Sequence, residues 1–170
     1  MSQIFVSGHK SPDTDSIAAA LSYSYLKRRL GMDAVAVRAG EINKESRFAL
    51  DYFDLEEPIL VTSVARKNPE DEKQKVILVD HNESKQTIDG MDDAEVLEII
   101  DHHRFGDFES ENPIFILVRP VGCVNTVIYG LYKANHIKPS REIAGIMLSA
   151  IISDTVLFRS PTTTEEDNET

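Results

Sequence analysis

The sequence has one cysteine, no apolar run long enough for a membrane span and comparatively few basic residues. The single Cys123 excludes an intramolecular disulfide framework and fits a reducing compartment, so we expect a cytoplasmic protein. No apolar run approaches the roughly 20 residues that a membrane-spanning helix needs. The first residues lack a basic segment followed by an apolar one. We therefore expect neither a signal peptide nor a membrane partner.

Acidic residues outnumber basic ones, with 29 Asp and Glu against 18 Lys and Arg and a formal net charge of −11. An acidic surface repels phosphate backbones, so we expect no nucleic-acid partner. Part of this negative charge is explained if several carboxylates hold divalent cations. The 170 residues, 41% of them apolar, are enough for one domain with a sizeable core.

Apolar runs alternate with amphipathic segments along the chain, which favours an α/β fold built from a mostly parallel sheet with flanking helices. The sequence predicts five strands, within residues 4–7, 33–40, 75–79, 94–101 and 113–120. It predicts helices over residues 16–30, 43–53, 124–135 and 141–154. Residues 57–64 form a further apolar segment whose type stays open, and the charged residues 65–74 read as a loop.

The ends of the predicted helices carry recognisable signals. Asp15 or Ser16 is expected to cap the first helix, and Gly31 is expected to end it. Asn43 is expected to cap the second helix. The polar and acidic run after residue 160 predicts no further helix or strand.

Acidic and histidine residues follow the predicted strands at the point where each strand ends. In open parallel sheets, ligands bind outside the carboxyl ends of the strands, so these side chains are expected to meet at one edge. Separate stretches of the sequence deliver them there: His9, Asp13 and Asp15 after the first strand, Asp80 and His102 after two later strands, and Asp154 at the end of the last helix.

Carboxylates this close together cannot all stay ionised without a compensating cation. Oxygen and imidazole ligands together suit manganese, iron, cobalt or zinc better than calcium. Asp13 and Asp15 are two residues apart, so each can face a different ion, with a third carboxylate such as Asp80 between the ions. Two ions about 3.5–4 Å apart form a clamp for attack on phosphorus. The pattern therefore favours metal-dependent phosphate chemistry.

Each short motif also has a simpler interpretation. Asp13 and Asp15 can be helix caps, the His102-His103 pair can be a surface feature, and residues 79–83 can be a turn. These explanations do not account for the joint placement of the motifs after successive strands. Cys123 lacks a partner base in any motif and is expected to be a packing residue, and His136 is expected to be exposed.

Five segments resemble the N-terminal domain of the family II inorganic pyrophosphatases, within the DHH phosphoesterase superfamily. They are "GHKSPDTDSI", "VDHNE", "DHHRFGDFES", "RPVGC" and "AGIMLSAIISDTVLFRSPT". The resemblance runs in order through nearly all of the chain. "DHH" indicates only the superfamily, whereas "VDHNE" and "SAIISDT" followed by "FRSPT" point to the pyrophosphatase branch.

The resemblance implies a dinuclear enzyme that hydrolyses pyrophosphate to two phosphates with two Mn²⁺ or Co²⁺ ions, Mg²⁺ also serving. It implies His9 and Asp13 as ligands of one ion, and Asp15, His102 and Asp154 as ligands of the other, with Asp80 bridging them.

The resemblance also implies roles for residues beside the ligands. His103 would lie beside the metals as a catalytic residue, and Asp101 would orient a neighbouring histidine. His81 would face the substrate or support the ligands. Val124 and Asn125 after "PVGC" depart from the usual family pattern, and we expect no consequence for the ligands.

Family members carry a second, C-terminal domain whose lysine and arginine residues, in an "SRKK"-like motif, help the leaving phosphate; this sequence has no such motif. We therefore expect residues 1–160 to be the DHH catalytic and metal-binding domain and residues 161–170 to begin an interdomain linker. The expected partners are pyrophosphate, the C-terminal domain and a second copy of the chain, paired through residues 113–120.

Two alternatives remain open from the sequence. One keeps the superfamily and changes the substrate, giving an exopolyphosphatase or a phosphodiesterase for small oligonucleotides. The acidic charge and "VDHNE" argue against it. The other is a metal-binding, dimerising domain that needs a partner chain to turn over substrate.

Overall fold

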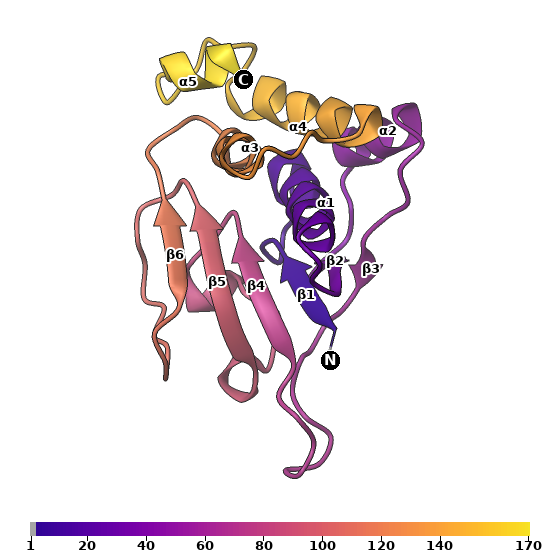
Figure 1. The fold of residues 1–170 in the computed structure, drawn as a ribbon, viewed down its shortest axis with the longest axis vertical. Helices are drawn as coiled ribbons and strands as arrows, with labels where there is room; N and C mark the ends of the chain where they lie inside the picture. Colours follow the sequence, from indigo (N-terminus) through magenta and orange to yellow (C-terminus); the bar gives the residue numbers. More distant parts are fainter. Residues whose placement is uncertain (1–2) are drawn as a thin grey trace.

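A computed structural model describes residues 3–170, and its centre is a sheet of six parallel strands (Figure 1). Their order is β3-β2-β1-β4-β5-β6. The bounds are β1 Ile4–Ser7, β2 Ala34–Arg38, β3 Ile59–Leu60, β4 Lys75–Val79, β5 Glu95–Asp101 and β6 Phe115–Val118. The α/β class is confirmed. The number of strands was wrong by one, because the unassigned apolar segment adds the two-residue β3 at one edge.

Two of the helices, the first and the third, cover one face of this sheet. The helices are α1 Thr14–Arg29, α2 Lys44–Tyr52, α3 Val124–Ala134, α4 Arg141–Asp154 and the short α5 Glu165–Glu169. Figure 1 shows α1 in front of the strands, and α1 and α3 contact the sheet while α4 packs on both of them. None of the helices within residues 3–170 combines the length and the apolar character that a membrane crossing requires.

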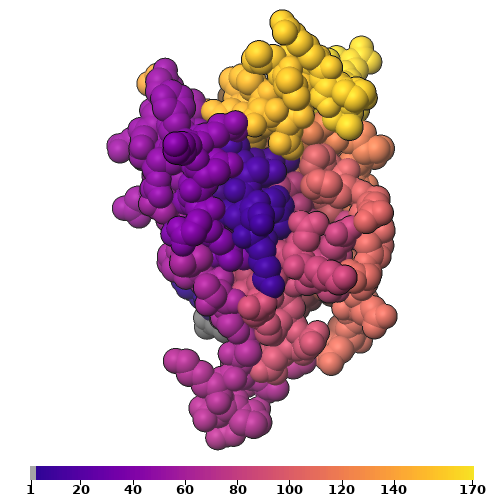
Figure 2. All heavy atoms as spheres, turned by 180° about the vertical axis from the view of Figure 1, so that it is seen from behind, coloured from indigo at the N-terminus to yellow at the C-terminus, as the bar shows by residue number. Residues whose placement is uncertain are grey.

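The opposite face of the sheet is covered by connecting segments, including the short 3₁₀ helices Ser84–Gln86 and Met91–Asp93. Val64 and Ile88 from these segments pack with Val76, Leu78 and Ile99 of the sheet. Figure 2 shows this side from behind, with the loop before β4 projecting at the lower end. Because both faces are covered, β4 is apolar at every position from Val76 to Val79 rather than alternating.

Strand order reverses between β1 and β4, which are adjacent although β2 and β3 lie between them in sequence. The chain leaves β1 toward one edge of the sheet and later leaves β4 toward the other. The crevice at such a reversal, outside the carboxyl ends of the two strands, is where open α/β sheets bind ligands. The fold therefore directs attention to the turn after β1 and to the residue that follows β4.

The start of α1 differs from the expectation. Asp13, not Asp15 or Ser16, is the cap, and its Oδ1 accepts a hydrogen bond from the Ser16 amide at 2.9 Å. Asp15 lies in the first turn, where its side chain is directed toward α3 instead. The cap of α2 by Asn43 is confirmed, with Asn43 Oδ1 accepting from the Ser46 amide at 2.7 Å.

The last ten residues form more structure than their composition predicted. The expectation of no further helix was wrong, because α5 forms with a capping box between Thr164 and Asp167. The buried Asp167 carboxylate also accepts hydrogen bonds from the Gly122 amide at 2.8 Å and the Thr126 hydroxyl at 2.7 Å. These long-range bonds fasten the segment to the start of α3. The role of residues 161–170 as the beginning of a linker stays a prediction.

Asp167→Ala is expected to lower the free energy of unfolding by about 2–3 kcal/mol, because it leaves buried donors without an acceptor. Burial alone raises the pKa of Asp167, but its hydrogen bonds outweigh burial and lower that pKa. The carboxylate therefore stabilises the fold above its unfolded-state pKa, near 4, and loses this effect as the pH falls below that value. Urea unfolding at neutral and acid pH measures both effects.

The matched control is Glu165→Ala, which removes an exposed carboxylate from the same helix. It should change the free energy of unfolding by less than about 0.5 kcal/mol. Equal losses in the two variants would show that Asp167 does not anchor the segment.

Candidate metal centre

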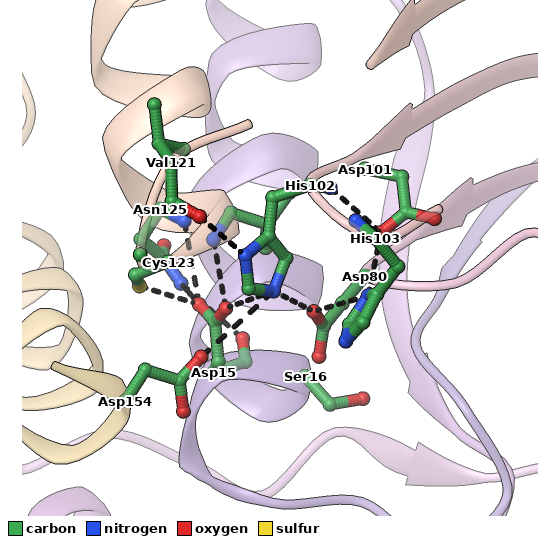
Figure 3. A network of polar contacts seen from close by, with 12 residues as sticks. Asp15, Ser16, Asp80, Asp101, His102, His103, Val121, Cys123, Asn125 and Asp154 are labelled. Atoms are coloured by element: carbon green, nitrogen blue, oxygen red, sulfur yellow. Dashed lines mark hydrogen bonds and ion pairs between the residues drawn. The ribbon is translucent and has the colours of Figure 1, made fainter. Parts of the chain in front are cut away.

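Four carboxylates and two histidines, expected from the sequence to meet, converge at the carboxyl edge of the sheet. Figure 3 shows four of these side chains, those of Asp15, Asp80, His102 and Asp154. The β1–α1 segment provides His9, Asp13 and Asp15. The residue after β4 is Asp80, the residue after β5 is His102, and α4 ends at Asp154.

Asp80 lies at the centre of this group. Its Oδ2 is 3.4 Å from His9 Nε2, and its Oδ1 is 3.2 Å from His102 Nε2. His9 Nε2 is also 3.6 Å from Asp13 Oδ2. On the other side, His102 Nε2 is 3.6 Å from Asp15 Oδ2 and 3.9 Å from Asp154 Oδ2. The two oxygens of Asp80 thus face two different sets of neighbours.

The backbone of Asp80 is held in an uncommon conformation, with φ of 63°. Only glycine adopts this left-handed region freely, although Asp and Asn tolerate it better than most residues. Such strain persists where the surroundings impose it, and it is concentrated at functional sites. Here the conformation turns the chain sharply at the end of β4.

Close packing of the β1–α1 segment requires glycine at position 8. A Cβ atom there would lie 1.8 Å from Ser16 Oγ. The same hydroxyl accepts a hydrogen bond from the His9 amide at 3.0 Å, which ties the backbone of His9 to the first turn of α1. The absence of a side chain at Gly8 therefore helps to place His9 against Asp80.

Hydrogen bonds to backbone carbonyls fix the tautomers of two histidines. His102 Nδ1 lies 3.0 Å from the Val121 carbonyl, and His81 Nδ1 lies 2.9 Å from the Val79 carbonyl. Because a carbonyl only accepts, Nδ1 carries the proton in both rings. In the neutral rings, Nε2 then has no proton and carries a free electron pair. His102 directs this electron pair at the carboxylate of Asp80.

Several buried polar atoms at the centre have no hydrogen-bond partner: His9 Nδ1, both oxygens of Asp80, His81 Nε2 and His102 Nε2. Buried polar atoms nearly always have a partner, so this group requires an explanation. Electron pairs that face one another across 3.2–3.4 Å fit a shared cation. Oxygen and imidazole nitrogen atoms are the ligands that first-row divalent metals accept. The residues present therefore fit a metal centre.

The same crowding changes the pKa values of the centre. Burial lowers the pKa of His9, but the carboxylates of Asp13 and Asp80 outweigh burial and raise it to about 10. Burial likewise lowers the pKa of His102, but the carboxylates of Asp80 and Asp15 outweigh burial and raise it to about 10. Burial and the charge of Asp15 raise the pKa values of Asp80 and Asp154. Without a cation, protons provide the compensating positive charge.

Three more residues named from the sequence lie at the edge of the group. Asp101 Oδ1 accepts hydrogen bonds from His103 Nδ1 at 2.8 Å and from the His102 amide at 2.7 Å. The side chain of His103 is 53% exposed, so it can reach solvent and ligands. His81 is buried edge-on to His9, and burial lowers its pKa to about 4. Their assigned roles stay predictions.

Sequence reasoning missed residues that hold the acidic side chains in place. The Val124 amide donates to Asp15 Oδ2 at 2.7 Å, and Asn125 Nδ2 donates to Asp15 Oδ1 at 2.6 Å. The Val124 contact uses the backbone alone, so only the Asn125 side chain bears on the proposed ligand Asp15, and the expectation of no consequence for the ligands stays a prediction. Cys123 is buried as expected, and its thiol also contacts Asp15, with Sγ at 2.9 Å from Oδ1. His136 is exposed, as expected.

Comparison with known proteins places this site in a family. Residues 3–151 match the profile of the DHH family, N-terminal domain. Because the match extends over most of the sequence, the chain belongs to the DHH family. It is 52% identical over 167 residues to a protein from Bacillus licheniformis and 48% identical to one from Listeria innocua, each named "Probable manganese-dependent inorganic pyrophosphatase".

A solved structure of a "putative family II inorganic pyrophosphatase" from Methanococcus jannaschii superposes with a TM-score of 0.86 at 41% identity, over 98% of this chain and 53% of the other. An exopolyphosphatase-related protein from Bacteroides fragilis superposes with a TM-score of 0.71 over 99% of this chain and 50% of its own length. Its 19% identity shows a shared fold alone.

The matches with curated relatives have one feature in common. They cover 98% of this chain but only 52–53% of the Bacillus licheniformis and Listeria innocua proteins. The chain thus spans about half the length of these relatives.

Cation binding at this centre is expected to strengthen as the pH rises. His9, with a pKa of about 10, carries a proton at neutral pH that a cation must displace, and the same holds in direction for His102. Each displaced proton should raise the apparent affinity for Mn²⁺ by about tenfold per pH unit. Calorimetric titration at pH 6, 7 and 8, in buffers that differ in ionisation enthalpy, measures the affinity and the protons released.

The alternative is binding by exposed carboxylates, which are fully ionised throughout this range. An affinity for Mn²⁺ that is independent of pH and buffer would therefore contradict binding at this centre.

Proposed function

We propose that this chain carries the metal-binding half of the active site of an inorganic pyrophosphatase, which hydrolyses pyrophosphate to two phosphates with two Mn²⁺ ions. The observation that carries the proposal is the buried Asp80 carboxylate, which lies between His9 and His102 and has no other polar partner. The names of the relatives and the structural neighbour support the substrate and the metal.

The proposed ligands divide into two sets that share Asp80. His9 and Asp13 lie on the Oδ2 side of Asp80 and would hold one cation. Asp15, His102 and Asp154 lie on the Oδ1 side and would hold the second. Co²⁺ accepts the same kinds of ligand as Mn²⁺, so it is expected to replace Mn²⁺ at both positions. Mg²⁺ is expected to bind more weakly.

The bound cations would lower the pKa of an attacking water and withdraw charge from the phosphoryl oxygens. The protein residues position and exchange protons around them. The Asp101 carboxylate raises the pKa of His103, because it accepts a hydrogen bond from Nδ1. His103 can then hold a proton on Nε2 at the exposed side of the site and donate it to the leaving phosphate. His81 offers a buried Nε2 acceptor.

The proposal also needs positive charge near the leaving phosphate. Salt bridges among residues 3–170 join no lysine or arginine to the six proposed ligands. Cationic groups that stabilise the leaving phosphate would then come from the half of the relatives that this chain does not cover. We therefore expect this chain to bind cations well and to hydrolyse pyrophosphate slowly by itself.

The substitution Asp80→Asn tests the proposal. It should reduce Mn²⁺-dependent phosphate release from pyrophosphate by at least about 100-fold, because it removes the shared ligand. It should also reduce or abolish the rise in melting temperature that Mn²⁺ causes in the wild-type chain, because a ligand stabilises a protein only as far as it binds the native state. Phosphate release and thermal unfolding with and without Mn²⁺ measure the two effects.

Asp33→Asn is the matched control, because it makes the same chemical change in the exposed loop before β2. It should leave both quantities unchanged. Phosphate release that survives Asp80→Asn would refute the assignment of the active site. Stronger release from linear polyphosphate than from pyrophosphate would refute the substrate and favour the exopolyphosphatase alternative.

We further propose that two copies of the chain pair through β6. This strand lies at the edge of the sheet and bonds to β5 alone, which leaves one row of backbone groups free to pair. Phe115 and Ile116 on this strand are 51% and 42% exposed. A second β6 strand would cover both the free backbone groups and these side chains.

Ile116→Lys is expected to convert a dimer into a monomer, because charge on an edge strand opposes strand pairing. Sedimentation equilibrium measures the mass. Leu148→Lys, at an exposed apolar position of α4, is the control that should stay dimeric. A wild-type chain that sediments as a monomer would disprove this pairing.

A further inference from the structure

Asp15 is fully buried, and its carboxylate is held by the segment that begins α3. Oδ1 accepts from the Cys123 thiol at 2.9 Å, from Asn125 Nδ2 at 2.6 Å and from the Asn125 amide at 3.3 Å. Oδ2 accepts from the Val124 amide at 2.7 Å. Figure 3 shows these contacts gathered on the side of Asp15 away from Asp80. Three consecutive residues thus provide four donors to one carboxylate.

The thiol of Cys123 takes part as a donor. Burial, together with the charge of Asp15, raises the pKa of Cys123, so the thiol keeps its proton. The contact is then a hydrogen bond from sulfur to the carboxylate and adds no negative charge.

The number of donors determines which oxygen remains available. Each carboxylate oxygen has two electron pairs, about four acceptor positions in all. Oδ1 already faces three donors and has no acceptor position left. Oδ2 faces one donor and has one acceptor position free. That remaining position is on the oxygen that lies 3.6 Å from His102 Nε2.

Asn125 orients this arrangement from α3. It is fully buried, and its Oδ1 accepts from the Ser22 hydroxyl of α1 at 2.9 Å. This bond fixes which end of the amide faces Asp15, so that Nδ2 donates both to the Asp15 carboxylate and to the Asp15 carbonyl, the latter at 3.2 Å. The amide therefore connects α1 to α3 at the residue that carries a proposed ligand.

We propose that Asn125 is a positioning residue whose side-chain amide, together with the Cys123 thiol, occupies Asp15 Oδ1 and directs Asp15 Oδ2 at the second cation. The inference rests on the proposed metal centre but not on its substrate. Residues that orient metal ligands typically contribute 10- to 100-fold to metal affinity. Without the side-chain amide, Oδ1 loses the shortest of its three hydrogen bonds, the carboxylate is held less firmly, and part of the ligand geometry is lost.

Asn125→Ala should weaken the binding of one of two Mn²⁺ ions by about 10- to 100-fold and leave the other within about twofold. Calorimetric titration of the chelator-treated chain with MnCl₂ measures both affinities without any substrate. Thermal unfolding of the metal-free chain measures the structural cost. Ser22→Ala keeps Asn125 but removes the bond that orients it, and it should weaken the same ion by a smaller factor.

Thr126→Val is the matched control. Thr126 is the next residue of α3 and is equally buried. Its substitution by valine removes one buried hydrogen bond, the one to Asp167. It should lower the melting temperature of the metal-free chain and leave both Mn²⁺ affinities within about twofold. A merely structural role for Asn125 predicts the same result for Asn125→Ala.

Two results would overturn the proposal. One is an unchanged pair of affinities in both Asn125→Ala and Ser22→Ala. The other is an equal loss of affinity in Thr126→Val. If Asn125→Ala does not fold, the Ser22→Ala and Thr126→Val pair decides between the two roles. Phosphate release is measured separately, so loss of the proposed pyrophosphatase activity with unchanged cation binding would leave this inference standing.

Discussion

The rest of the site depends on the electrostatic repulsion among Asp13, Asp15, Asp80 and Asp154, which the fold forces together. Parallel strands bring every carboxyl end to one edge of the sheet, and the reversal of strand order leaves a crevice there. A buried negative charge is costly unless it is paired or coordinates a cation. The protein provides partial compensation at Asp13 and Asp15, which accept hydrogen bonds at the first turns of α1 and α3. At Asp80 it provides only His9 and His102, which compensate the charge when they carry protons.

The sequence predicted this arrangement because the relevant signals are local. Apolar runs that end abruptly in Asp80 or in Asp101-His102 mark buried strands, and the carboxyl ends of such strands have a known place in the fold. Side chains that follow them are brought together by topology, whatever the details of packing. The same reasoning located His9, since its segment follows β1 directly.

The errors concern features that depend on contacts between distant segments. Asp15 and Ser16 were expected as caps because both residue types are good caps. The Asp15 side chain instead accepts a hydrogen bond from the buried start of α3, and Asp13 is the cap. Nothing local in residues 161–170 shows that Asp167 accepts from Gly122 and Thr126. Asn125 reads as an ordinary polar residue of a helix until Asp15 is placed beside it. Tertiary contacts override local preference at each of these positions.

Under the proposed function, the distribution of charge also explains why this site would need cations before it could bind a phosphate ester or anhydride. Among residues 3–170, the salt bridges of these carboxylates involve only histidines, and Lys10 pairs with a carboxylate outside the centre, Asp89. An anionic substrate approaching this edge would therefore meet net negative charge once the histidines lose their protons. Bound divalent cations would reverse the sign of the field at the proposed point of attack. The carboxylates that make the metal-free site unfavourable would thus be the feature that makes the loaded site attractive to phosphate.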